Sequence, residues 1–427
     1  MALCTRCGAA LEPAAAHCGR CGTAVAATRP TVQSGPVAPP GRGRRGLLIG
    51  GVAIAGVLAL VGAGLVVSRY VTPSVTATAT ASPSPMPASA SSATSSATLQ
   101  AASPSPVVTT PPHAASEVVA TIPVGQSPMV PAVAPDGTAY VADADGQSLT
   151  IIRDDAAAAT IDLGWKPAPP AVGSDGTVYV PSSADGRMAV VKNGKVVSFV
   201  MIGHNPTQPT VAANGLVYVS NIDDQTVSIV KSGTIVGTFP VGQHPSAPGV
   251  APNGHLYVAN TADGTVTYYK GNDDNIDTIS VGNNPQRPAA APDGTVYVAN
   301  RDAPTVSIIK DAQVVSTVDV GWDPTWPVVA PDGTVYVTSN GDSTVSVFRG
   351  TRIVATLKVG KKPVGPTAGP DGTVYVANSD DGTVSVIKDA KVIGTIRVGS
   401  HPSTPAVAAD GTVYVPNTGD GTVSVLR

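Results

Sequence analysis

The feature that most constrains this chain is a turn followed by a strand, which recurs eight times from residue 117 to the C-terminus. A typical copy reads PDGTVYVAN, with an Asp-Gly or Asn-Gly pair ahead of alternating β-branched and aromatic residues. Such a pair suits the positive φ angles of a tight hairpin, and a period of two is typical of a β-strand. The turn residues recur every 39 or 40 positions: Asp136, Asp175, Asn214, Asn253, Asp293, Asp332, Asp371 and Asp410.

Each repeat divides into four short β-runs, and repeats of this length with several short strands predict the blades of a propeller. The last repeat stops at Arg427, after its third strand. The missing fourth strand is present before the first repeat, where EVVATIPVG (117–125) matches KVIGTIRVG (391–399). We therefore predict an all-β, eight-bladed β-propeller with four-stranded blades over residues 117–427, in which the N-terminal strand closes the ring and leaves no edge open.

The repeat resembles that of the YVTN-type β-propeller family, through the pattern VG..P..PAVAPDGTVYVAN…GTVSVIK. The resemblance covers residues 117–427 and every unit. It implies a surface-layer-like propeller scaffold, of a kind often found on cell surfaces. Because members of this family do many different things, it implies little about chemistry.

Charge is distributed unevenly along the chain. The formal net charge is −3, but seven of the 26 Lys and Arg residues and one of the 29 Asp and Glu residues precede Glu117. The propeller region therefore holds 19 basic and 28 acidic side chains. Phosphate binding needs a basic face, so this balance argues against nucleic acid as a partner.

The sequence ahead of the repeats divides by composition into a Cys-bearing segment (1–22), a basic Pro/Gly-rich linker (23–46), an apolar run (47–67) and a Ser/Thr/Ala/Pro-rich stalk (68–116). As a helix, the apolar run would span roughly 30 Å, the hydrocarbon thickness of a bilayer. Arg42, Arg44 and Arg45 precede it and only Arg69 follows. This asymmetry predicts a single-pass transmembrane helix in the cell membrane, with a cytoplasmic N-terminus and an extracytoplasmic propeller. The alternative is a signal peptide, whose apolar core is usually about 7–15 residues.

All four cysteines lie in the first segment, as two CxxC-G pairs separated by ten residues: Cys4, Cys7, Cys18 and Cys21. This spacing predicts a structural zinc site with four thiolate ligands, which leaves no open position for catalysis. The segment resembles the short zinc-ribbon modules found at bacterial N-termini. A redox role is the alternative, although the segment has no βαβ context. We predict no cofactor in the propeller.

A second motif, [VLI]-G-x-x-P-x-x-P, joins the outermost strand of each blade to the innermost strand of the next. We call these eight segments the crossings: residues 124–131, 163–170, 202–209, 241–248, 281–288, 320–327, 359–366 and 398–405. The glycine and prolines have a structural reason to be there, and we expect none for the variable positions. All three tryptophans and three of the six histidines occupy variable positions.

Blade topology predicts that the crossings share one face with the turns between second and third strands. We therefore expect that face to carry Asp143, Asp145, Asp185, Asp223, Asp224, Asp263, Asp302, Asp342, Asp380, Asp381 and Asp420. Aromatic side chains ringed by carboxylates and amides suit a sugar, a peptide or a cationic group. The proposed ligand-binding residues are Trp165, Lys166, His204, Asn205, His244, Asn283, Asn284, Arg287, Trp322, Asp323, Trp326 and His401.

Two alternatives to this face stay open. The tryptophans could fill gaps between blades, and the aspartates could serve only to make turns. The histidines show no spacing typical of metal ligands. The stalk is expected to join the opposite face, so that the face with the tryptophans points away from the membrane.

These patterns favour a membrane-anchored surface module that binds an envelope glycan or a partner protein. The alternatives are a propeller enzyme of the lactonase or lyase type and a passive surface-layer or spacer protein. We expect no enzyme and no catalytic residues. The propeller holds one glutamate, Glu117, on its outermost strand, whereas metal-dependent lactonase propellers usually place a glutamate at the central axis.

Overall fold

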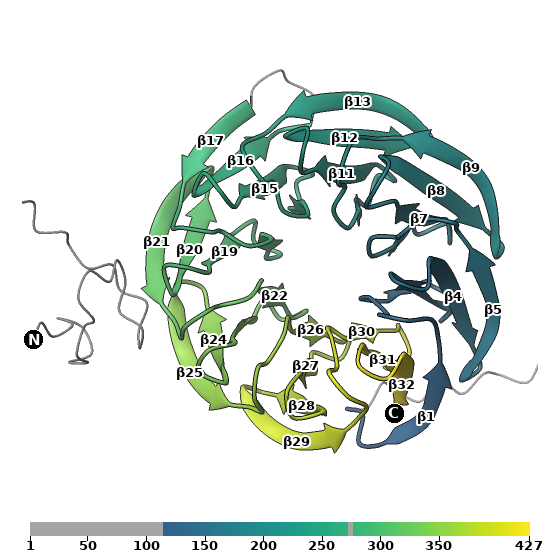
Figure 1. The fold of residues 1–427 in the computed structure, drawn as a ribbon. Coiled ribbons are helices and arrows are strands. Elements are labelled where there is room, and N and C mark those ends of the chain that lie inside the picture. Colours follow the sequence, from purple (N-terminus) through teal and green to yellow (C-terminus); the bar gives the residue numbers. More distant parts are fainter. Residues whose placement is uncertain (1–113, 272–275) are drawn as a thin grey trace, which may run out of the picture. The chain divides into compact units, whose positions relative to one another are not determined.

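The computed structural model describes residues 114–271 and 276–427, which form a closed ring of eight four-stranded antiparallel sheets (Figure 1). The predicted eight-bladed propeller is thus confirmed. The predicted zinc ribbon, basic linker, transmembrane helix and nearly all of the stalk lie outside the described residues. Within the described residues, no helix is long and apolar enough to cross a membrane.

The four strands of each blade follow one another from the central axis outward. Blades 1 to 4 comprise β2 (Ala132–Val133), β3 (Ala139–Asp143), β4 (Ser148–Arg153) and β5 (Ala156–Asp162); β6 (Ala171–Val172), β7 (Val178–Pro181), β8 (Arg187–Lys192) and β9 (Lys195–Met201); β10 (Thr210–Val211), β11 (Val217–Asn221), β12 (Thr226–Lys231) and β13 (Thr234–Pro240); and β14 (Gly249–Val250), β15 (Leu256–Asn260), β16 (Thr265–Tyr269) and β17 (Ile276–Ser280). Blades 5 to 8 comprise β18 (Ala289–Ala290), β19 (Val296–Asn300), β20 (Thr305–Lys310) and β21 (Gln313–Asp319); β22 (Val328–Val329), β23 (Val335–Ser339), β24 (Thr344–Arg349) and β25 (Arg352–Lys358); β26 (Thr367–Ala368), β27 (Val374–Asn378), β28 (Thr383–Lys388) and β29 (Lys391–Arg397); and β30 (Ala406–Val407), β31 (Val413–Asn417), β32 (Thr422–Leu426) and β1 (Val118–Pro123).

The ring is closed by pairing of the first described strand with the last. β1 lies antiparallel to β32, with Ile122 opposite Val423, and so completes blade 8 as predicted. The backbone N–H of Ser116 donates to the carbonyl of Arg427 at 2.8 Å. The Arg427 guanidinium also contacts both carboxylate oxygens of Asp155 in blade 1, at 2.6 and 2.8 Å. The two ends of the propeller are therefore joined to each other and to the neighbouring blade.

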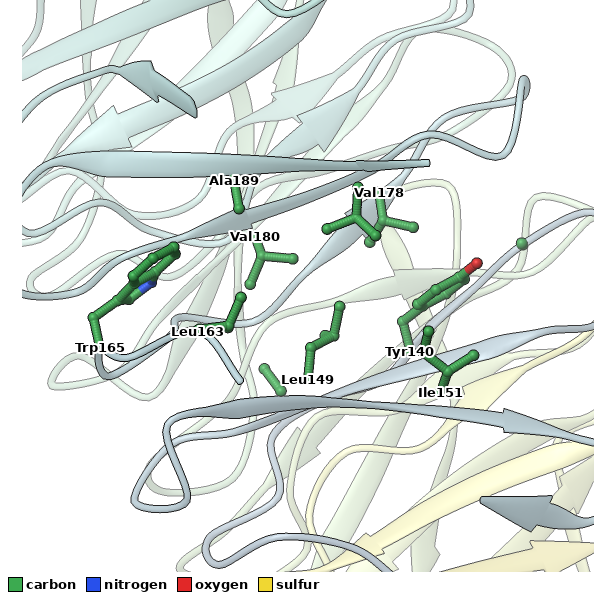
Figure 2. Close-up of a cluster of buried hydrophobic side chains, with 11 residues drawn as sticks. Tyr140, Leu149, Ile151, Leu163, Trp165, Val178, Val180 and Ala189 are labelled. Carbon is green, nitrogen blue, oxygen red and sulfur yellow. The ribbon is translucent and has the colours of Figure 1, made fainter. Parts of the chain in front are cut away.

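The core consists of apolar layers between neighbouring blades. The second strand of a blade, such as β11, is buried along its whole length because a blade packs against each of its two faces. The outermost strand β25 alternates between exposed and half-buried residues, and β5 is exposed along most of its length. One such layer joins blades 1 and 2, where Leu149 and Ile151 face Val178 and Val180 (Figure 2).

Candidate ligand-binding face

The crossings and the turns between second and third strands lie on the same face, as the topology predicts. The proline at the fifth position of each crossing forms a bridge with the residue that ends the second strand or, in blade 2, directly follows it, as Pro128 does with Asp143. The backbone N–H of Leu163 donates to the carbonyl of Gln147 in the turn beside it, at 2.9 Å. We call this surface the crossing face. The Asp-Gly and Asn-Gly turns between first and second strands lie on the opposite face.

A buried asparagine at the end of the second strand holds the glycine of the crossing in blades 4, 5 and 8. In blade 4, the amide nitrogen of Asn260 donates to the hydroxyls of Thr265 and Thr267, both at 2.9 Å. Its amide oxygen accepts a bond from the backbone N–H of Gly242 at 3.0 Å. A Cβ added to Gly242 would come within 2.6 Å of Cγ of Asn260, so this position of the crossing must be glycine. This role of the asparagine was not predicted from the sequence, although its recurrence in the YVAN copies was a usable signal.

Several turn aspartates fix the crossings from outside. The carboxylate of Asp224 accepts a bond from the backbone N–H of His204 at 2.8 Å, and this bond is the main cause of its lowered pKa. The same contact, between a turn carboxylate and the backbone N–H of the third crossing residue, is formed by Asp263, Asp342, Asp381 and Asp420 at 2.6–2.8 Å. These five carboxylates therefore have a structural role in the loops. This agrees with the alternative that the aspartates are structural rather than ligand-binding.

The fourth crossing position also has a structural role, contrary to our expectation that the variable positions have none. Seven of the eight residues there adopt a left-handed backbone, with φ between 49° and 55°. These residues are Ser127, Asn205, His244, Asn284, Asp323, Lys362 and His401. Asn, Asp and His tolerate this conformation better than most residues. The backbone conformation therefore explains the residue type at five of the proposed ligand-binding positions. The eighth residue, Lys166, is exposed and pairs with Asp145 at 3.0 Å.

The third crossing position presents its side chain to solvent in seven blades. His204, Asn283 and Trp322 are exposed there. Nδ1 of His204 lies 3.0 Å from Oδ1 of Asp224, and the hydrogen bond to this carboxylate raises the pKa of the imidazole. The third position therefore exposes its side chains on the crossing face more consistently than the fourth position. The exposed residues at the fourth position are Lys166, His244, Lys362 and His401.

Trp165 is the exception at this position, because it fills a gap between blades 1 and 2 (Figure 2). Only 8% of the residue is exposed. Its ring packs edge-on against Phe199, with centroids 5.6 Å apart, and the Arg187 guanidinium lies 4.6 Å from its centroid. Its Nε1 is buried without a hydrogen-bond acceptor among the described residues. Trp165 is thus buried between the blades rather than exposed on the crossing face, and its place among the proposed ligand-binding residues stays a prediction.

The other two tryptophans occupy different environments. Trp322 is 45% exposed on a crossing that Asp342 holds by the backbone N–H at 2.8 Å. Trp326 is half-buried at the central axis and lines a cavity of about 780 Å³. The gap-filling alternative therefore holds for Trp165, whereas Trp322 is exposed on the crossing face and Trp326 lines the central cavity.

The central cavity opens within a ring of residues at the seventh crossing position, one from each blade, which we call the mouth ring. Its members are Val130, Pro169, Gln208, Ala247, Arg287, Trp326, Gly365 and Thr404. Seven of them line the cavity, and Gly365 lies beneath the indole of Trp326. Among the described residues that line this cavity, Arg287 is the only charged one. Its burial lowers its pKa, but an arginine remains protonated at neutral pH.

The carboxylate of Asp143 was expected on the crossing face but is fully buried. It occupies the position that asparagine holds in five other blades, at the end of the second strand of blade 1. The hydroxyls of Ser148 and Thr150 donate to its Oδ2 at 2.9 and 2.7 Å. Burial raises the pKa of this carboxyl above its ordinary value.

Within residues 114–271 and 276–427, no group of three or more His, Cys, Asp or Glu side chains is placed to hold a metal ion. The four cysteines of the predicted zinc site lie outside these residues. The predicted zinc site therefore remains a prediction.

The sequence matches no family model and no curated protein. Among solved structures, the chain is similar to a streptogramin B lyase, with 12% identity and a TM-score of 0.53 over 61% of this chain and 93% of the lyase. It is also similar to the hydrazine synthase of Kuenenia stuttgartiensis, with 18% identity and a TM-score of 0.51 over 74% and 97% of the two chains. A functionally unknown protein from Desulfotomaculum acetoxidans matches with 18% identity and a TM-score of 0.51 over 60% and 94%. At these identities the similarity shows a β-propeller fold and nothing about activity.

Proposed function

We propose that this chain is a binding protein whose crossing face recognises a component of the cell envelope. The observation that carries the proposal is Trp322, an exposed aromatic ring on a loop that is already fixed. Its backbone N–H is held by Asp342, and the preceding Gly321 packs against Ser339 and Asp342. Because the loop is ordered before a ligand arrives, binding to the ring would cost little conformational entropy. An exposed indole offers a flat apolar surface to a sugar ring or a peptide side chain.

The cellular location and the orientation that we propose for this face rest on the sequence. Residues 47–67 would anchor the chain in the membrane, and the propeller would lie outside it. β1 begins on the face opposite the crossings, because Pro123 at its end leads into the first crossing. A stalk that enters there would point the crossing face away from the membrane. The YVTN-type family membership and the zinc ribbon are proposals of the same kind.

We do not propose a catalytic role. The similarity to a lyase and to hydrazine synthase concerns the fold, and one fold can carry unrelated activities. The groups on the crossing face with clear partners mostly serve the crossings themselves, as Asp224 and Asp342 do. Exposed side chains that remain, such as Trp322 and Asn283, are suited to contact with a ligand.

Sedimentation of the full chain in detergent with cell-envelope material freed of lipid tests the proposal, because the proposed membrane anchor cannot then carry the chain into the pellet. We expect the wild-type protein to sediment with the envelopes in a saturable way, and Trp322→Ala to lose most of this binding. Ile393→Ala is the control, since it removes an apolar side chain that is 55% exposed from the outermost strand β29 of blade 7. Equal binding by the wild type and both variants would exclude Trp322 from recognition, and no binding by any of them would refute the envelope as the partner.

A further inference from the structure

The mouth ring contains one cation, Arg287, whose protein partners are all neutral. Its Nη1 donates to Oε1 of Gln208 at 3.0 Å, and its Nη2 donates to Oγ1 of Thr210 at 3.3 Å. No carboxylate lines the cavity in the part of the chain that the structure describes. A guanidinium has five N–H donors, so three of them have no acceptor among the described residues. A partly desolvated cation of this kind favours an anionic ligand.

The side chains that hold Arg287 are themselves fixed. The amide nitrogen of Gln208 donates to the carbonyl of Pro170 in blade 2 at 3.2 Å, and the hydroxyl of Thr210 donates to the carbonyl of Pro248 in blade 4 at 2.7 Å. Arg287 comes from blade 5 and so reaches across the first strand of blade 4 to blade 3. Gly249 lies on that path, where a Cβ would come within 2.5 Å of the carbonyl oxygen of Pro288. The guanidinium is therefore held in place before any ligand binds.

The rest of the cavity is mostly apolar. Trp326 lies in the next blade from Arg287, and the walls below both are formed by short side chains of the innermost strands, such as Ala290 and Val329. The same two residues also line a second cavity of about 450 Å³, whose walls are Pro, Ala, Val and Gly residues. The space below Arg287 therefore suits an apolar body rather than a second charge.

We propose that the central cavity binds a small organic carboxylate, with the carboxylate on Arg287 and the apolar part against Trp326 and the cavity wall. The planar fork of a guanidinium matches a carboxylate by paired N–H···O bonds. A single cation balances a single negative charge, which favours a monoanion over a phosphate dianion. The cavity volume of about 780 Å³ is that of a site for a small molecule. The inference rests on the proposed binding role of the crossing face and names the ligand class for its centre.

Isothermal titration calorimetry of the full chain with sodium phenylacetate and with its neutral analogue phenylacetamide tests the site. We expect phenylacetate to bind at least ten times more tightly than phenylacetamide. Arg287→Gln should abolish this preference. Lys361→Gln, which removes an exposed positive charge from another crossing, should leave it unchanged.

A second variant protects the test against a failure of Arg287→Gln to fold. Gln208→Glu keeps the shape of the side chain but places a carboxylate beside the guanidinium, which should also abolish phenylacetate binding. Equal affinities for the acid and the amide in the wild-type protein, no binding of either, or a preference retained in Gln208→Glu would each overturn the proposal.

Envelope sedimentation separates this result from the proposed function. If phenylacetate does not bind but envelope binding still depends on Trp322, the carboxylate site is wrong and the proposed function stands. If phenylacetate binds through Arg287 and the envelope is not bound, the carboxylate site stands and the envelope role fails.

Discussion

The indole of Trp326 lies directly against Gly365, so that a Cβ built on Gly365 would clash with Cε2 of the ring. The two residues occupy equivalent positions of neighbouring crossings, and both belong to the mouth ring. The absence of a side chain in blade 7 is what lets the indole from blade 6 lie along the wall of the cavity. The shape of the cavity wall therefore depends on which residues of the mouth ring are neighbours.

Replacing Gly365 with alanine should push Trp326 off the wall. We expect a loss of stability of about 1–3 kcal/mol, as is typical when an extra methyl group is forced into a packed site. Trp326 should also become more accessible to acrylamide, as measured by fluorescence quenching. The matched control is Gly394→Ala, because a Cβ at Gly394 in β29 meets nothing within 4 Å. Equal effects of the two substitutions on stability and on quenching would contradict this account of the wall.

Asp143 should destabilise the propeller at neutral pH, so that Asp143→Asn should stabilise it. An asparagine there could donate to Thr150 and Ser148, as Asn260 does to its two threonines in blade 4. We expect a gain of about 1 kcal/mol, the net value of a typical buried hydrogen bond. Urea unfolding of both proteins at pH 7 measures it.

The gain from Asp143→Asn should depend on pH in a defined direction. Burial raises the pKa of Asp143 in the folded state above its ordinary value of 3.8. Between these two pKa values the folded state holds more protons than the unfolded state, so wild-type stability falls relative to the asparagine variant as the pH rises. The gain should be full above the folded pKa and should disappear well below pH 3.8. A gain that does not change with pH would show that the charge of Asp143 is not its cause.

Closure of the ring should depend on the inward side of β1. Ile122 is 3% exposed in the core beside blade 1, whereas Val119 on the same strand is 42% exposed. Ile122→Ala should therefore cost about 2–4 kcal/mol, and Val119→Ala about 0.5 kcal/mol or less. Thermal or urea unfolding of the two variants compares them. Similar costs would mean that β1 does not contribute its inner face to the core of blade 8.

The sequence predicts the fold of the propeller well because each strand and turn is specified locally and repeated. The last repeat lacks a fourth strand, and residues 117–125 match the fourth strand of the preceding repeat. These two observations were sufficient to predict the closure of the ring. The candidate face was harder, because one loop motif places its residues in three environments. The third position faces solvent, the fourth requires a left-handed backbone, and the seventh faces the central cavity.

The errors follow from contacts between segments that are far apart in sequence. Nothing in the crossing that contains Trp165 indicates that Phe199 and Arg187 will cover its ring. The sequence shows that Asp143 stands where five other blades have asparagine. The burial of the Asp143 carboxylate, however, follows only from its packing against the first crossing. The approach of Arg287 to Gln208 likewise depends on the curvature of the ring.

The most direct test of the central claim, that the crossing face binds a ligand, is a fluorescence titration of the full chain with soluble peptidoglycan fragments. The protein has three tryptophans, and two of them lie on or at the centre of this face. We predict a saturable change in tryptophan emission that persists in Trp165→Phe and is strongly reduced in Trp322→Phe. No saturable change, or a change that persists when Trp322 and Trp326 are both replaced by phenylalanine, would contradict the claim.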